Sequence, residues 1–123
     1  MGILGEFRAS HVMPGMLGPE GRPHSHDYRI EAVVGRDELD DSDMVCDLDL
    51  LGSALNAAIE RVRDRDLEVI KPPEVAAVTV ELLARWAHRE IAHGIGGVDG
   101  TLSVRVWEST VAFGGYAAPL SSS

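Results

Sequence analysis

Along this chain the interval between apolar side chains changes from two residues to three or four residues and then back to two. No other feature of the sequence constrains its fold as strongly. From Tyr28 to Val34 every second residue is apolar, which predicts a strand with one buried face. Between Leu48 and Val62 the apolar residues recur at intervals of three and four, which predicts an amphipathic helix. Residues 102–107 return to alternation. This order predicts helices and strands that are segregated along the chain.

Turn and capping residues divide the rest of the chain into further elements. The predicted order is a strand at 6–13, a Gly- and Pro-rich loop at 14–24, a strand at 28–34, a helix from 48 to about 64–67 with Asp47 or Asp49 near its start, a helix capped by Thr79, and strands at 102–107 and 110–117. The fold class is therefore α+β, with a four-stranded antiparallel sheet and two helices on one face. We expect one domain spanning residues 1–123, with its core at about 6–117. The two open edges of such a sheet favour association between copies.

The charge of the chain excludes several kinds of partner. It carries 20 acidic and 11 basic side chains, a formal net charge of −9. Nucleic acids and anionic lipid surfaces are bound through basic surface, so neither is expected as a partner. Cys46 is the single cysteine, and the N-terminus lacks the pattern of a signal peptide. We therefore expect a cytoplasmic protein.

Three histidines form a candidate metal site. His24 and His26 lie two residues apart at the start of a predicted strand, so both imidazoles face the same side. His11, on the neighbouring strand, can supply a third nitrogen, and three protein ligands with one open position are typical of catalytic zinc. A chance pair of surface histidines is the alternative. The spacing from Gly18 through the His pair to Glu31 also fits the first metal motif of the cupins, but two intervening helices do not fit that fold.

The segments of the chain resemble, in order, those of one known family. The opening Phe7-Arg-Ala-Ser-His11 is similar to the Phe-x-Ala-x-His of the 6-pyruvoyl tetrahydropterin synthase and 6-carboxytetrahydropterin synthase family, and His24-Ser-His-Asp-Tyr28 to its His-Gly-His-Asn-Tyr. Met44-Val-Cys-Asp47 and Val78-Thr-Val-Glu81 resemble its Met-Val-x-Asp and Pro-Thr-x-Glu segments. Val106-Trp-Glu-Ser109 resembles its Val-x-Val-x-Glu-Thr strand. The resemblance extends over nearly the whole chain.

The resemblance implies a fold, an assembly and several site residues. The fold would be the tunnelling fold, a ββααββ subunit whose sheets join into an oligomeric barrel, as a hexamer made of two trimers. Zn²⁺ would be held by His11, His24 and His26. Glu108 would bind the guanidine-like edge of a pterin, and Thr79 would lie at the rim of the pterin pocket, in addition to capping its helix.

The sequence departs from this family at the residues that transfer protons. The family has a Cys in the loop before the His pair, where this chain has Glu20, and an Asp-His pair where this chain has Asp64 and Arg65. An arginine stays protonated and can hold an anion but cannot shuttle a proton. Glu20 is the candidate general base, because partial burial raises the pKa of a carboxylate toward neutrality, and a loop glutamate that faces water is the alternative. Family members with Glu at or beside the Cys position cleave the side chain to 6-hydroxymethyl-dihydropterin.

Two functions remain open at this point. One is a zinc-dependent enzyme acting on the side chain of a pterin or a related purine-derived substrate, with altered acid–base residues. The other is a zinc-containing pterin- or purine-binding protein without synthase activity. We further expect Asp27 to hold the ring nitrogen of a ligating histidine, and His88 and His93 to be surface residues.

Overall fold

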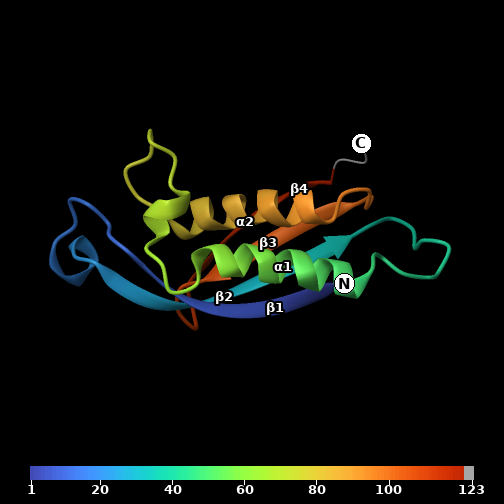
Figure 1. Cartoon of the computed structure of the whole chain (residues 1–123), viewed down its shortest axis with the longest axis horizontal. Helices are drawn as coiled ribbons and strands as arrows, with labels where there is room; N and C mark the ends of the chain where they lie inside the picture. The colour runs from blue at the N-terminus through green and yellow to red at the C-terminus, as the bar shows by residue number, and fades with distance from the viewer. Residues whose placement is uncertain (121–123) are drawn as a thin grey trace.

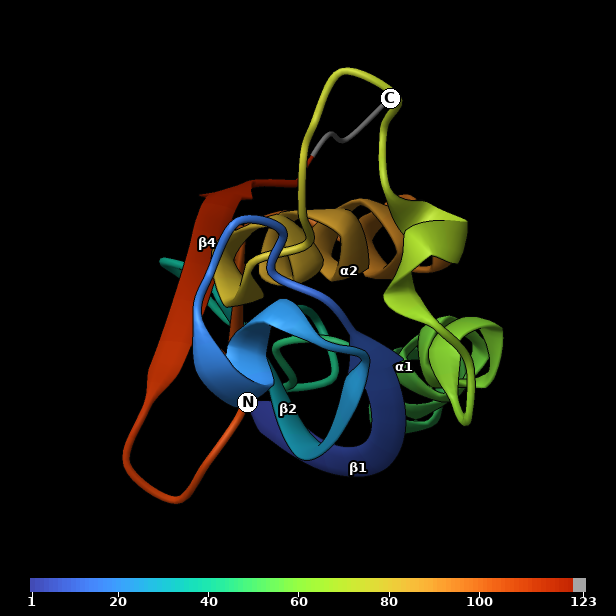
Figure 2. The same ribbon diagram turned by 90° about the vertical axis from the view of Figure 1, so that its left-hand side faces the viewer.

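The computed structural model describes residues 1–120 as a curved sheet with two helices lying along one of its faces (Figure 1). Its elements, in chain order, are β1 (Gly2–His11), the short 3-10 helix η1 (Gly18–Gly21), β2 (His24–Gly35), α1 (Leu48–Val62), the 3-10 helix η2 (Leu67–Ile70), α2 (Val80–Gly94), β3 (Thr101–Trp107) and β4 (Phe113–Pro119). Figure 2 looks at one end of the molecule and shows α1 and α2 on the same side of the sheet. The predicted ββααββ order is confirmed.

The sheet is antiparallel throughout, with its strands in the order β1-β2-β3-β4. Ile30 of β2 lies opposite Val106 of β3, and Val104 lies opposite Tyr116 of β4. The strands β1 and β4 therefore form the two edges. Within residues 1–120, no helix combines the length and the apolar character that crossing a bilayer would need.

The core fills the space between the sheet and the helices. The alternating face predicted for residues 28–34 is buried, since Tyr28, Ile30, Ala32 and Val34 are at most 2% exposed. The predicted apolar face of α1 is buried from Leu51 onward, but Leu48 is 52% exposed. Leu48 is the first residue of the helix, so the buried face begins at Leu51, one position of the predicted apolar pattern later.

Several helix and strand boundaries in the structure differ from the predicted ones. The strand β2 begins at His24 rather than at Tyr28, because its pairing with β1 continues as far as His11 opposite His24. The helix α1 ends at Val62, before the predicted 64–67, because the backbone turns away from helical geometry at Arg63. The strand β4 begins at Phe113 rather than at 110, since the preceding residues form a turn in which Ser109 Oγ accepts hydrogen bonds from two backbone N–H groups.

The first helix is capped by an aspartate, which gives a stability prediction. The Asp47 carboxylate accepts hydrogen bonds from the N–H groups of Asp49 at 2.8 Å and Leu50 at 3.4 Å. Asp47→Ala should therefore lower the free energy of unfolding by about 0.5–2 kcal/mol. Urea unfolding at one fixed protein concentration measures this loss. Asp49→Ala, which removes a first-turn carboxylate that caps nothing, is the control, and a loss at Asp49 as large as that at Asp47 would contradict the prediction.

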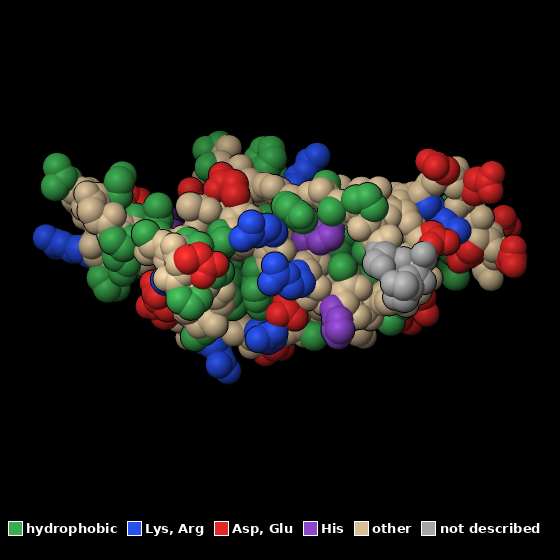
Figure 3. Space-filling model, turned by 90° about the horizontal axis from the view of Figure 1, so that it is seen from above, with side chains coloured by type: hydrophobic (Ala, Val, Ile, Leu, Met, Phe, Trp, Pro, Cys, Tyr) green, Lys and Arg blue, Asp and Glu red, His purple; other side chains and the backbone are tan. Residues whose placement is uncertain are grey.

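Several basic side chains lie along α2, which also carries Glu81 and Glu90. Figure 3 shows Arg and His side chains near the middle of this face with acidic side chains among them, and a further group of acidic side chains toward one end. A groove between α2 and β4 is lined by Arg85, His88, Arg89 and His93. His88 is only 7% exposed, donates from Nε2 to the Ala118 carbonyl oxygen at 3.4 Å, and packs against Tyr116. The expectation that His88 is a surface residue was wrong, whereas His93 is exposed.

Candidate metal centre

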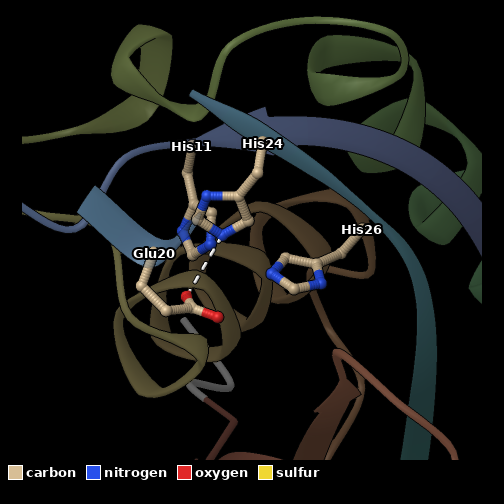
Figure 4. Close-up of side chains that lie close together, drawn as sticks. All are labelled: His11, Glu20, His24 and His26. Atoms are coloured by element: carbon tan, nitrogen blue, oxygen red, sulfur yellow. Dashed lines mark ion pairs between the residues drawn. The ribbon is translucent and has the colours of Figure 1, made fainter. Parts of the chain in front are cut away.

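The pairing of β1 with β2 brings three histidines together. His11, the last residue of β1, lies directly opposite His24, the first residue of β2, and His26 follows two residues later on the same face. The three ring centroids are 4.5, 4.8 and 5.1 Å apart. Figure 4 shows the three rings converging. The predicted proximity of His11, His24 and His26 is therefore present in the structure.

Backbone carbonyl groups orient two of these rings. The His11 Nδ1–H donates to the Val78 carbonyl oxygen at 3.1 Å, and the His24 Nδ1–H donates to the Arg22 carbonyl oxygen at 2.8 Å. A carbonyl oxygen can only accept, so Nδ1 carries the proton in both rings and the Nε2 atom of each neutral ring keeps its lone pair. Metal-bound histidines are held by such outer hydrogen bonds.

The Nε2 atoms of the three rings lack the partners that buried polar atoms normally have. All three are buried, and none forms a hydrogen bond with the described residues. Buried nitrogens without partners are rare because they lose hydration without compensation. Burial, followed by the effect of His11, lowers the pKa of His26, which favours the neutral imidazole. Three neutral nitrogens directed at one point suit a cation.

A carboxylate completes the group. Glu20, on η1, places its Oε2 3.3 Å from His24 Nε2, and the four ligand atoms of His11, Glu20, His24 and His26 all lie within 4.8 Å of one another. This contact is an ion pair only if His24 is doubly protonated; with a bare Nε2 there is no proton to share. The four residues could together hold a metal ion. Sequence reasoning chose Glu20 for proton transfer and missed its position among the ligand atoms.

The predicted role of Asp27 was wrong. Its carboxylate lies 2.9 Å from the guanidinium of Arg8, and both side chains are well exposed. Asp27 alternates with His26 along β2, so its side chain points to the other face of the sheet. The backbone carbonyl groups of Val78 and Arg22 do what had been expected of Asp27.

Glu108 lies in a groove beside the histidines. It follows the last residue of β3 and is partly buried, as its alternation with Val106 predicts. The groove has a volume of about 550 Å³, and Glu108, His26 and Trp107 are among its lining residues. No described residue forms a hydrogen bond or an ion pair with the Glu108 carboxylate. Arg105 points to the other face, where it lies 3.9 Å from Glu31.

The remaining predicted residues lie around this centre. Thr79 caps α2 by accepting a hydrogen bond from the N–H of Leu82, and the adjacent residue, Val78, holds the His11 ring. Asp64 and Arg65 are exposed. Their backbone lies beside β1, because the Asp64 N–H donates to the Arg8 carbonyl oxygen and the Ser10 N–H donates to the Arg65 carbonyl oxygen. Within this chain, neither Asp64 nor Arg65 belongs to the group of four ligand atoms.

Comparison with known proteins finds one matching protein family. A family model described as 6-pyruvoyl tetrahydropterin synthase matches residues 3–118. No curated protein sequence matches the chain. Solved structures of similar shape include the Caenorhabditis elegans 6-pyruvoyl tetrahydropterin synthase, with 18% identity, a TM-score of 0.74 and coverage of 96% of this chain and 94% of that one.

Two further structures have similar statistics. The Plasmodium falciparum enzyme has 12% identity and a TM-score of 0.73, with coverage of 97% of this chain and 98% of that chain. A Plasmodium vivax variant in which a catalytic glutamate is replaced by alanine has 10% identity and a TM-score of 0.70, with the same coverage. At such identities the likeness shows the fold, and it confirms the predicted tunnelling fold.

Proposed function

The chain belongs to the 6-pyruvoyl tetrahydropterin synthase family, and from this membership we propose that it is a zinc-dependent lyase or synthase acting on the side chain of a pterin of the dihydroneopterin type or a related purine-derived substrate. The observation that carries the proposal is the convergence of three buried Nε2 atoms that have no hydrogen-bond partner within residues 1–120. Family membership supports the pterin-related chemistry, and the histidine geometry supports the metal.

His11, His24 and His26 would hold the zinc ion through Nε2. The donor set fits, because neutral imidazole nitrogens are preferred zinc ligands and three of them leave a position for substrate. When bound, zinc supplies Lewis acidity toward an oxygen of the substrate side chain. The hydrogen bonds to the Val78 and Arg22 carbonyl oxygens keep the rings of His11 and His24 in the tautomer that the metal needs.

Glu20 would move the proton in this reaction. Its carboxylate is half-exposed and lies beside the histidine cluster, in a position where a base can reach a C–H or O–H next to the metal. The catalytic glutamate of the Plasmodium vivax relative is a precedent for this residue type. In this proposal Asp64 and Arg65 polarise or hold the leaving group, since Arg65 can stabilise an anion but not exchange a proton.

Glu108 would bind the heterocycle. A carboxylate that is partly buried and has no internal partner suits a ligand that presents two N–H donors side by side, as pterins, guanines and deazapurines do. The groove that Glu108 shares with His26 connects this anchor with the metal centre. Thr79, at the start of α2, would line the rim of the same site.

The chain would work as a homo-oligomer, as a hexamer formed by two trimers. The support is the pair of sheet edges, β1 and β4, although β1 is already paired with residues 64–66 near Arg8 and Ser10. Joining these edges between copies would extend the sheet into a barrel. We propose no nucleic acid or membrane partner.

A second candidate function follows from the proton-transfer residues. The loop between β1 and β2 contains no cysteine, and Arg65 stands where a family histidine would be. A zinc-containing pterin- or purine-binding protein without synthase activity is the alternative that these two differences favour.

Native mass spectrometry after incubation with a panel of pterins tests the two candidates together. We expect a six-chain assembly with one zinc ion per chain and a retained pterin. A shortened pterin released from dihydroneopterin triphosphate indicates the enzyme, and an intact bound ligand with no product indicates the binding protein. Chelator-treated protein, which should lose both the metal and the ligand's side-chain contacts, is the control. A chain with neither metal nor bound pterin would refute both candidates.

A further inference from the structure

We propose that Glu20 is a fourth, displaceable ligand of the metal, which closes the site in the absence of substrate and is released when substrate binds. This inference rests on the proposed metal site and gives Glu20 a second role besides proton transfer. The two roles exclude each other in time, because an oxygen bound to the metal cannot also accept a proton from the substrate.

The distance between Glu20 and His24 is the first support. Ligands at about 2.0–2.1 Å from a tetrahedral zinc ion lie about 3.3–3.4 Å from one another, the edge of the tetrahedron. The observed separation of Glu20 Oε2 and His24 Nε2 is 3.3 Å. A direct hydrogen bond of charged groups would be shorter, at about 2.7–2.9 Å. This pair is thus spaced as two ligands of one ion would be, while the four ligand atoms as a group lie within 4.8 Å of one another.

The hydrogen bond that orients His24 is the second support. Nδ1 donates to the Arg22 carbonyl oxygen at 2.8 Å, so a neutral ring presents its Nε2 lone pair to the carboxylate. In that neutral form the two electron-rich atoms, 3.3 Å apart, would repel each other unless a cation lay between them. The Nε2 atoms of His11 and His26 face the same place, so one ion would satisfy all four groups.

The loop that carries Glu20 explains why this ligand alone could leave. The histidines belong to paired strands, whereas Glu20 belongs to η1 in the loop between them. The loop backbone is held at this residue, because the N–H of Met13 donates to the Glu20 carbonyl oxygen at 2.9 Å, and it passes close to Met16 at Gly21, where a Cβ would collide with the Met16 carbonyl oxygen. The side chain itself is 53% exposed. Rotation about its own bonds can therefore move the carboxylate off the metal without moving the fold.

Once released, the Glu20 carboxylate would lie next to the position at which the metal would take an oxygen of the substrate. The residue that blocks the empty site is thus delivered as a base when the site is filled. This order keeps the unused metal from binding other oxygen ligands, and it makes substrate binding a competition with Glu20.

Cobalt substitution tests the inference without relying on activity, because the visible spectrum of Co²⁺ reports the number and type of its ligands. Glu20→Ala and Glu20→Gln should both change the spectrum of the Co²⁺-loaded chain and weaken Co²⁺ binding on the order of tenfold or more, the least that loss of an outer-shell partner costs. Azide should bind to the Co²⁺ of both variants at least tenfold more tightly than to wild type, where it must displace Glu20. Glu38→Gln, an exposed change of equal charge, is the control and should leave all three readouts unchanged.

The outcomes separate this inference from the proposed metal site. Co²⁺ bound with the same spectrum, affinity and azide binding in wild type and both variants would overturn the role of Glu20 as a ligand and leave the histidine site standing. Failure of the wild-type chain to bind Co²⁺ at all would overturn both.

Discussion

Replacement of His26 by alanine is expected to remove stoichiometric metal from the protein while leaving the chain folded. Outer residues that only orient a ligand already contribute roughly 10–100-fold to metal affinity, so loss of a ligand should weaken Zn²⁺ binding by more than about 100-fold. The metal-free fold should not suffer, because the change removes one of three buried nitrogens for which the described part of the chain offers no hydrogen-bond partner. Elemental analysis of purified protein measures the metal, and circular dichroism measures the fold.

His93→Ala is the matched control for this experiment. His93 is exposed in the last turn of α2, outside the group of converging ligand atoms, so its replacement should leave the metal content at the wild-type value. Full metal content in His26→Ala, or equal losses in the two variants, would show that the histidine cluster does not hold the metal.

Glu108→Gln is expected to weaken the binding of a pterin by about 1.5–3 kcal/mol, the contribution of hydrogen bonds to a charged group. This corresponds to roughly 10–150-fold in the dissociation constant. The amide presents one acceptor and one donor where the carboxylate presents two acceptors, so one of the ligand's two N–H groups loses its partner. Titration calorimetry with neopterin, biopterin and guanine measures the change.

The control for Glu108 must alter the charge in the same way at a distant position. Glu38→Gln meets this condition, because Glu38 is exposed in the acidic segment after β2. It should leave the affinity unchanged. If wild type binds none of the three compounds, or if Glu108→Gln binds them as tightly as wild type, Glu108 is not the anchor.

The parts of the fold that could be predicted are those set by short-range patterns. Alternation identified the buried face from Tyr28 to Val34, and Thr79 was correctly identified as a helix cap. Asp47, which caps α1, was one of two aspartates predicted near the start of that helix. The histidine pair was recognisable because residues two apart on a strand share a face. Pairing of the two strands then brought His11 to the same point.

The parts that could not be predicted depend on contacts between distant backbone atoms. The carbonyl group of Val78 orients His11 across 67 positions of sequence, and every residue has a carbonyl group, so no residue type signals this contact. The position of Glu20 depends on the course of a loop with two glycines at positive φ, Gly15 and Gly18. The burial of His88 results from the packing of α2 against β4, which its helix alone does not reveal.

The location of Glu20 on a loop, apart from the strands that carry the histidines, has a consequence for how such a protein can diversify. A change of residue type at position 20 exchanges the reactive group, yet it alters neither the strand pairing nor the three imidazoles. The hydrogen bond between Met13 and Glu20 within the loop uses backbone atoms alone, so it does not depend on the side chain at position 20. New reactions can thus arise by single-codon changes in the loop, at nearly constant thermodynamic stability, while selection on the scaffold continues independently.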